Sequence, residues 1–65
     1  MELFSYEASE LNGCKEIARL GENAVYVGES GFAYLLKHTG SVYQLNDVEA
    51  ADPQKFLADV EKYNL

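Results

Sequence analysis

The sequence is poor in the residues from which catalytic sites, disulfides and targeting signals are usually built. It holds one cysteine, one histidine, one proline and no tryptophan. A lone Cys14 excludes an internal disulfide, and no segment has the basic start, apolar middle and small-residue cleavage site of a signal peptide. The purely apolar runs span only a few residues, far fewer than the roughly 20 that a membrane-spanning helix requires. We therefore expect a reducing, cytoplasmic compartment.

Basic residues are also scarce. Five Lys and Arg residues against eleven Asp and Glu residues give a formal net charge of -6. The mean field of such a chain repels phosphate groups and attracts basic surfaces, which argues against direct nucleic-acid binding. Aromatic residues are plentiful by contrast, with five tyrosines and three phenylalanines in a chain that is 48% hydrophobic. We therefore expect one small globular domain, residues 1–65, with too little interior for a deep catalytic cleft.

The clearest element is a helix from about residue 53 to 64. Asp52 offers a capping carboxylate, and Pro53 stands at the first helical position, where its missing N–H costs nothing. Apolar residues then recur at helical spacing and form one stripe: Phe56, Leu57, Val60 and Tyr63. This pattern predicts an amphipathic helix that docks on a sheet.

The middle of the chain predicts three strands joined by two hairpin turns. The turn signals are Gly28–Gly31 and His38–Ser41, and each is flanked by β-branched and aromatic residues. Loops of two or four residues would place an apolar set on one side of the sheet, with these facing pairs: Val27 and Phe32, Val25 and Tyr34, Leu36 and Tyr43, and Tyr34 and Leu45. A three-residue loop with a bulge at Thr39 and Gly40 would instead place Gln44 beside Tyr34 and bury an amide. We therefore expect even loops.

Under that register the opposite face of the sheet is mixed. Tyr26, Leu35 and Val42 then form an apolar group with no obvious partner inside the molecule.

The N-terminal portion predicts a helix, because Leu11, Cys14, Ile17 and Ala18 fit a helical stripe that Gly21 could end. Gly13 within the stripe disfavours it by about 1 kcal/mol relative to alanine. A short strand at 3–6, before that helix, is the alternative. The fold class is then α+β, with a three-stranded antiparallel sheet flanked by an N-terminal and a C-terminal helix in the order α-β-β-β-α.

This inferred order resembles the topology of the double-stranded-RNA-binding domain over nearly the whole chain. That family holds phosphates with lysines at the start of its final helix. The matching stretch here, 47–55, begins with Asp47 and carries Glu49 and Asp52. The resemblance thus implies a shared architecture and no shared function.

The sequence offers few residues that could form a catalytic, metal-binding or phosphate-binding site. Cys14 lies on the predicted buried stripe and His38 beside a turn, so no nucleophile, base and orienting group are expected to meet. Asp47, Glu49 and Asp52 lack the spacing of a calcium loop, and capping of the last helix explains Asp52. The turn at Gly28 lacks the lysine of a phosphate-binding loop. We predict no enzyme, no cofactor and no metal site.

The leading hypothesis is therefore a small acidic binding protein, an inhibitor or regulator that engages the basic surface of a protein partner. In size and charge it resembles the inhibitors that phages use against nucleases or CRISPR complexes, including those that act as DNA mimics. The candidate binding residues are Glu7, Glu10, Asp47, Glu49 and Asp52. The alternative is a protein-interaction or homodimerisation module that uses Tyr26, Leu35 and Val42. Either a monomer or a homodimer fits. Salt should weaken the first kind of binding strongly and the second weakly.

Overall fold

The computed structural model describes all 65 residues and is an α+β fold with an antiparallel sheet. The strands are β1 (Glu2–Ser5), β2 (Lys15–Leu20), β3 (Asn23–Val27), β4 (Ala33–Leu36) and β5 (Val42–Gln44). The helices are the short 3-10 turn η1 (Ala8–Leu11) and the α-helices α1 (Asp47–Ala51) and α2 (Pro53–Tyr63). Neither α-helix has the length and hydropathy needed to cross a membrane.

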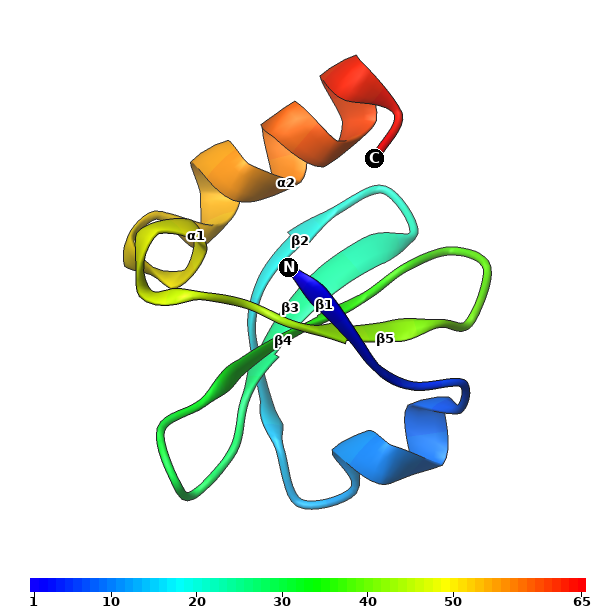
Figure 1. The fold of residues 1–65 in the computed structure, drawn as a ribbon, viewed down its shortest axis with the longest axis vertical. Coiled ribbons are helices and arrows are strands. Elements are labelled where there is room, and N and C mark those ends of the chain that lie inside the picture. Colours follow the sequence, from blue (N-terminus) through cyan, green and yellow to red (C-terminus); the bar gives the residue numbers. More distant parts are fainter.

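The sheet has five strands, so the prediction of three was wrong. The spatial order is β1-β5-β4-β3-β2, and every neighbouring pair is antiparallel. Strands β2 to β5 follow one another as a meander, and β1 pairs with β5 at one edge. Both α-helices lie at the same end of the sheet, and η1 lies at the other end (Figure 1). The expected α-β-β-β-α order, and with it the likeness to the double-stranded-RNA-binding domain, is therefore absent.

The predicted N-terminal helix is replaced by η1 and β2. Residues Lys15–Leu20 form an edge strand that pairs with β3 through a two-residue turn at Gly21 and Glu22. Gly21 has a φ of 61°, which suits such a turn because glycine carries no Cβ. The apolar spacing in this segment indicated a helix because Ile17 lies at a bulge, where the side chains of β2 do not alternate strictly between the two faces. The alternative strand near 3–6 is confirmed as β1, Glu2–Ser5.

Both later hairpins have the odd loops that the sequence argument rejected. Backbone hydrogen bonds join Gly28 N to Phe32 O at 3.1 Å and Lys37 N to Ser41 O at 3.0 Å, so each loop holds the three residues between them. The third loop residue is a glycine with positive φ, 93° at Gly40 in the second loop, as three-residue hairpin loops require. Every expected cross-strand pair is consequently shifted by one residue.

The shifted register places Tyr34 opposite Gln44 and Leu35 opposite Val25. Burying the Gln44 amide is not a penalty here, because this face is only partly covered and no buried side-chain polar atom lacks a hydrogen bond. The side of the sheet under α2 gains Leu35, which is fully buried. The register of a strand is set by which of its faces is buried. Here the aliphatic side chains of Val25 and Leu35 pack under α2, and the side chain of Tyr34 lies on the other face of the sheet.

The main core lies between α2 and this face of the sheet. Its buried members are Val25, Ala33, Leu35, Leu45, Phe56, Leu57 and Val60. The predicted helix at about 53–64 and its first three stripe residues are confirmed, whereas Tyr63 is 62% exposed. On the opposite face Ala24 and Val42 are fully buried, and Phe4 packs on Tyr34 with ring centroids 4.8 Å apart.

Candidate protein-binding surface

Two capping interactions hold the acidic residues of the C-terminal third in place. Asn46 Oδ1 accepts from the backbone N–H of Glu49 at 2.8 Å, and Glu49 Oε1 accepts from the Asn46 N–H at 2.9 Å, which is a reciprocal capping box for α1. Asp52 Oδ1 accepts from the Lys55 N–H at 3.2 Å and caps α2. The caps define where each helix begins, so the carboxylates lie on backbone that is hydrogen-bonded at both helix starts.

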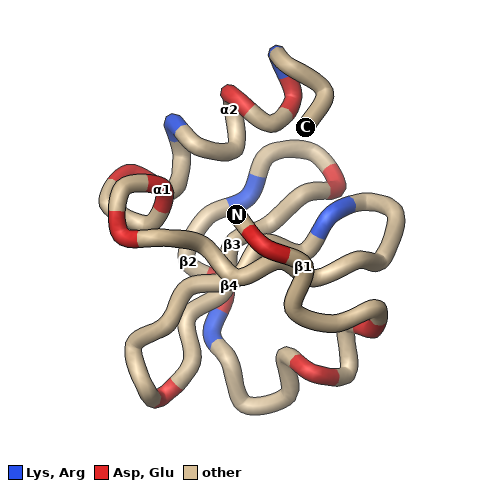
Figure 2. The backbone as a smooth tube through the Cα atoms, viewed as in Figure 1, with Lys and Arg blue, Asp and Glu red and all other residues tan.

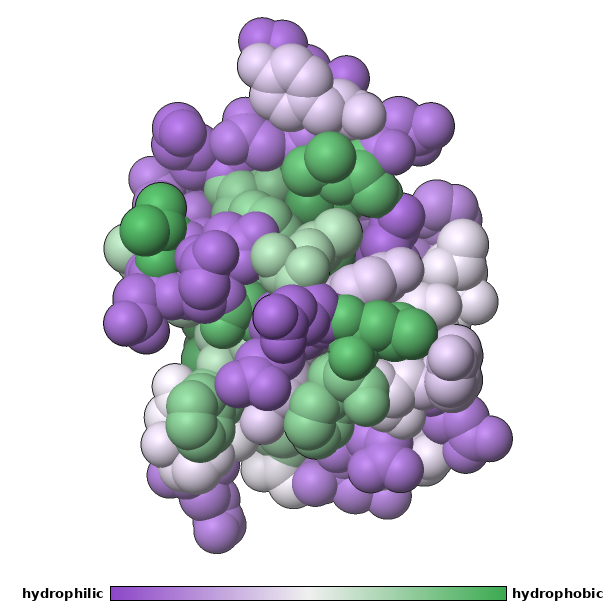
Figure 3. Space-filling view, in the orientation of Figure 1, coloured by the Kyte–Doolittle hydropathy of each residue, from purple (hydrophilic) through white to green (hydrophobic).

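These helices present an apolar side chain among carboxylates. Val48 is 85% exposed, more than any other large hydrophobic residue of the chain. Beside it lies a small hollow of about 120 Å³ whose lining residues are Val48, Glu49, Asp52, Lys55, Phe56 and Asp59. We call these residues together with Asp47 the α1 surface. Figure 2 shows acidic segments along α1, and Figure 3 shows one hydrophobic group there bordered by hydrophilic ones.

The charge of the α1 surface is strongly negative. It contains four carboxylates and one cation, Lys55, whose Nζ lies 3.7 Å from Asp59 Oδ2. Glu49 also accepts from the Met1 ammonium group at 2.9 Å. Asp47, by contrast, has no ion-pair partner within 4 Å. The surface thus offers anionic acceptors around an exposed aliphatic group, an arrangement that suits a lysine or arginine side chain with its apolar stem and charged head.

The five predicted acidic residues are not gathered in one place. Asp47, Glu49 and Asp52 lie together at α1, whereas Glu7 precedes η1 and Glu10 lies within it, at the other end of the molecule (Figures 1 and 2). The acidic set therefore divides into two groups, and only the group at α1 surrounds an exposed apolar residue.

The three predicted apolar residues do not form a surface patch. Leu35 points to the side of α2 and belongs to the main core, so its assignment to the open face was wrong. Val42 does lie on the opposite face, but it is fully buried. Tyr26 is half-buried, and its hydroxyl group donates to Glu16 Oε1 at 3.3 Å. The one-residue register error explains the misplacement of Leu35, because a shift of one moves the side chains of β4 to the other face, whereas Tyr26 and Val42 lie on the predicted face.

No protein-family model, curated protein or solved structure matches the chain.

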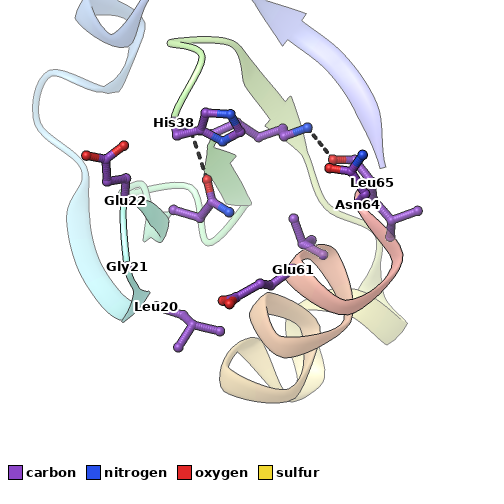
Figure 4. Close-up of a pocket in the computed structure, with 10 residues that line it drawn as sticks. Leu20, Gly21, Glu22, His38, Glu61, Asn64 and Leu65 are labelled. Carbon is purple, nitrogen blue, oxygen red and sulfur yellow. Dashed lines mark hydrogen bonds between the residues drawn. The ribbon is translucent and has the colours of Figure 1, made fainter.

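A second cavity, of about 300 Å³, opens between the β2–β3 turn, the β4–β5 loop and the end of α2. Figure 4 shows His38, Glu22 and Glu61 reaching its rim from three separate segments. The only two hydrogen bonds drawn there run from the backbone N–H of His38 to Asn23 Oδ1, at 2.8 Å, and from the Lys37 ammonium group to the Leu65 backbone oxygen. No carboxylate orients the imidazole, so the cavity lacks a base with an orienting partner.

Cys14 lies apart from His38. It is half-buried in the loop between η1 and β2, not on a buried helical stripe, and it lines a different hollow with Gly28. The Cys14 Sγ atom would lie 3.4 Å from a Cβ atom built on Gly28. No three His, Cys, Asp or Glu side chains lie close enough together to hold a metal ion.

Val48 and Asp59 belong to the α1 surface, although sequence patterns did not indicate either as a site residue. A signal for their neighbourhood was present, because Asn46 followed three residues later by Glu49 is the pattern of a capping box. Reading it would have started a helix at Asp47 and placed Val48 on that helix's first turn. The exposure of Val48 depends on tertiary packing, since α1 buries none of its residues against the sheet.

Proposed function

We propose that this protein is a non-enzymatic binding module that inhibits or regulates a partner protein by docking the α1 surface on a basic patch. The observation that carries the proposal is the exposed Val48 among the carboxylates of Asp47, Glu49, Asp52 and Asp59. Isolated acidic residues are common on small soluble domains, but an aliphatic side chain that is 85% exposed within such a cluster supplies the apolar centre that an interface needs.

The partner that fits is a protein surface rich in lysine and arginine. Such surfaces are what nucleic-acid-handling complexes present to phosphate groups, so carboxylates on the capped helices would act there in place of phosphates, as in a DNA mimic. The net charge of -6 would speed the encounter, and Val48 would add apolar contact once docked. A cytoplasmic location belongs to the same proposal.

The open sheet face gives the alternative function little support. Leu35 and Val42 are fully buried, so neither side chain is accessible to a partner or to a second copy of the chain. We therefore place the contact at α1.

The proposal can be tested by photo-crosslinking in cells that make the protein. A photoreactive amino acid replaces Val48 in one variant and Glu29, in the loop between β3 and β4, in the matched control. Both positions are exposed, so neither replacement should disturb the core. We expect a distinct crosslinked protein from position 48 and none of the same mass from position 29. Equal crosslinking from both positions, or from position 29 alone, would contradict the assignment of the α1 surface.

A further inference from the structure

The two edges of the sheet differ in how they are protected. Antiparallel sheets end in strands whose outer backbone N–H and C=O groups are free to pair with another chain, and proteins usually shield these groups with charges, bulges or a covering element. Here the edge strands are β1 and β2, each hydrogen-bonded to a single neighbour, β5 and β3 respectively.

The β2 edge is shielded in several ways. Lys15, Glu16 and Arg19 place charges along it, and Glu16 Oε1 pairs with Arg19 Nη2 at 2.7 Å. The strand is bulged at Ile17, and α2 packs against it. The side chain of Gln54 on α2 also donates to the backbone oxygen of Arg19 at 3.2 Å, which occupies one acceptor of this strand. A further strand has little room to add at β2.

The β1 edge has fewer of these protections. It is bulged near Phe4, but its two central side chains are apolar and no helix packs extensively against it. Leu3 is 48% and Phe4 47% exposed, and Tyr6 just beyond the strand is 80% exposed. Figure 1 shows β1 at the front of the molecule with no other element over it, and Figure 3 shows hydrophobic groups there. Glu2 is the only charged residue of the strand.

We propose that the β1 edge binds an extended segment of a partner protein, which adds to the sheet as a sixth strand. Main-chain hydrogen bonds to the free edge of β1 would supply the pairing, and alternating side chains of the segment would cover Leu3 on one face and Phe4 on the other. This inference stands apart from the proposed use of the α1 surface, because the two sites share no residue.

The charges beside β1 favour a basic segment of a partner protein, and not a second copy of this chain, as the occupant of the edge. Glu2 lies in the strand, and Glu7 and Glu10 follow it. Antiparallel pairing of two copies through β1 would bring Glu7 and Glu10 of each copy toward Glu2 at the N-terminal end of the other copy's β1, where the Met1 ammonium group is already paired with Glu49. Like charges would then face each other. A segment with lysine or arginine at its two ends would instead meet carboxylates at both ends of β1.

The test uses a fluorescently labelled, end-capped peptide, Lys-Thr-Val-Tyr-Val-Thr-Lys, and a control peptide with proline at its centre. Proline removes a backbone N–H and is poorly tolerated within a sheet. The variants are Leu3→Lys on β1 and Ile17→Lys on β2, which start from nearly equal exposures of 48% and 46% and make the same change in charge. Circular dichroism shows whether each variant keeps its fold, and Leu3→Thr replaces Leu3→Lys if that variant unfolds.

Fluorescence anisotropy should show binding of the first peptide and none of the proline peptide. Leu3→Lys should raise the dissociation constant by about fivefold or more, while Ile17→Lys changes it by less than about twofold. Amide NMR signals of residues 2–6 should shift when the peptide is added. Equal effects of the two lysine variants would overturn the proposal. So would a loss of binding in Asp47→Asn/Asp59→Asn alone, which would place the peptide on the α1 surface, or a concentration-dependent dimer that Leu3→Lys abolishes.

Discussion

Asp52 has two separable roles, because its carboxylate caps α2 and also contributes charge to the α1 surface. Asp52→Ala removes the cap and should lower the free energy of unfolding by about 0.5–2 kcal/mol. Asp52→Asn keeps an acceptor for the Lys55 N–H and should cost only a small part of that, while removing the same charge. Urea unfolding followed by circular dichroism measures both. Equal destabilisation by the two variants would show that charge, and not the cap, stabilises this helix start.

Glu16 makes the clearest prediction for pH. Its hydrogen bonds from Arg19, and the positive charge there, hold the pKa of the Glu16 carboxyl below its usual range. A carboxyl with a lowered folded-state pKa stabilises the fold above its unfolded pKa, and this contribution is lost as pH falls through the folded pKa. The side chain is exposed, so the effect should be small.

Arg19→Gln should therefore reduce the dependence of the fold's stability on pH in the acidic range. We expect the difference in urea midpoint between wild type and Arg19→Gln to shrink as pH is lowered from 7 to 3, since protonated Glu16 no longer attracts the guanidinium group. Lys15→Gln removes the same charge from the same strand without touching Glu16 and is the control. A difference between wild type and Arg19→Gln that stays constant over this range would show that the ion pair does not contribute to stability.

At the level of single residues, the sequence was sufficient where a local interaction decides the structure. Asp52 as a cap, Pro53 at the first helical turn, and the burial of Phe56, Leu57 and Val60 all follow from contacts within one helix and its own apolar stripe. Residues whose environment depends on distant segments were harder to place. Leu35 and Tyr34 exchanged faces because one residue in a loop changes the parity of the strand that follows.

The one-residue register error changes the faces of β4, and the register of this strand can be tested directly. Leu35→Ala should lower the free energy of unfolding by about 2–5 kcal/mol, because it empties a fully buried site. Phe32→Ala, at a side chain that is 53% exposed, should cost about 1 kcal/mol or less. In a chain this small Leu35→Ala can unfold outright, in which case Leu35→Val supplies the graded measurement. A larger loss from Phe32→Ala than from Leu35→Ala would support the rejected even-loop register.

The strand β2 was assigned the wrong type for a physical reason. Residues 15–20 read Lys-Glu-Ile-Ala-Arg-Leu, which are good helix formers as well as acceptable strand residues. Pairing with β3 decides in favour of a strand, and that pairing depends on the tight turn at Gly21, which was interpreted as a helix stop. Local propensity could not settle the matter because the stabilising contacts are between strands.

For the molecule as a whole, the charge balance was readable from composition, but its distribution was not. The count of eleven acidic residues predicts attraction to basic partners, and only the fold shows that they divide between α1 and η1. The fold class α+β could be predicted, whereas the strand number and the position of the helices could not, since both depend on long-range pairing. The functional residues remain a proposal that rests on geometry at α1.

The most direct measurement of that proposal compares two variants with equal net charge. Asp47→Asn/Asp59→Asn and Glu7→Gln/Glu10→Gln each remove two negative charges, the first pair from the α1 surface and the second from the opposite end. The dissociation constant of the partner identified by crosslinking is measured for both and for wild type, at low and at high salt. Docking at α1 predicts that the first variant binds about tenfold or more weakly and depends less on salt than wild type, because a charge-assisted hydrogen bond contributes about 1.5–3 kcal/mol. The second variant should bind nearly as wild type. Equal weakening by both would show that only the total charge matters and would contradict a specific site at α1.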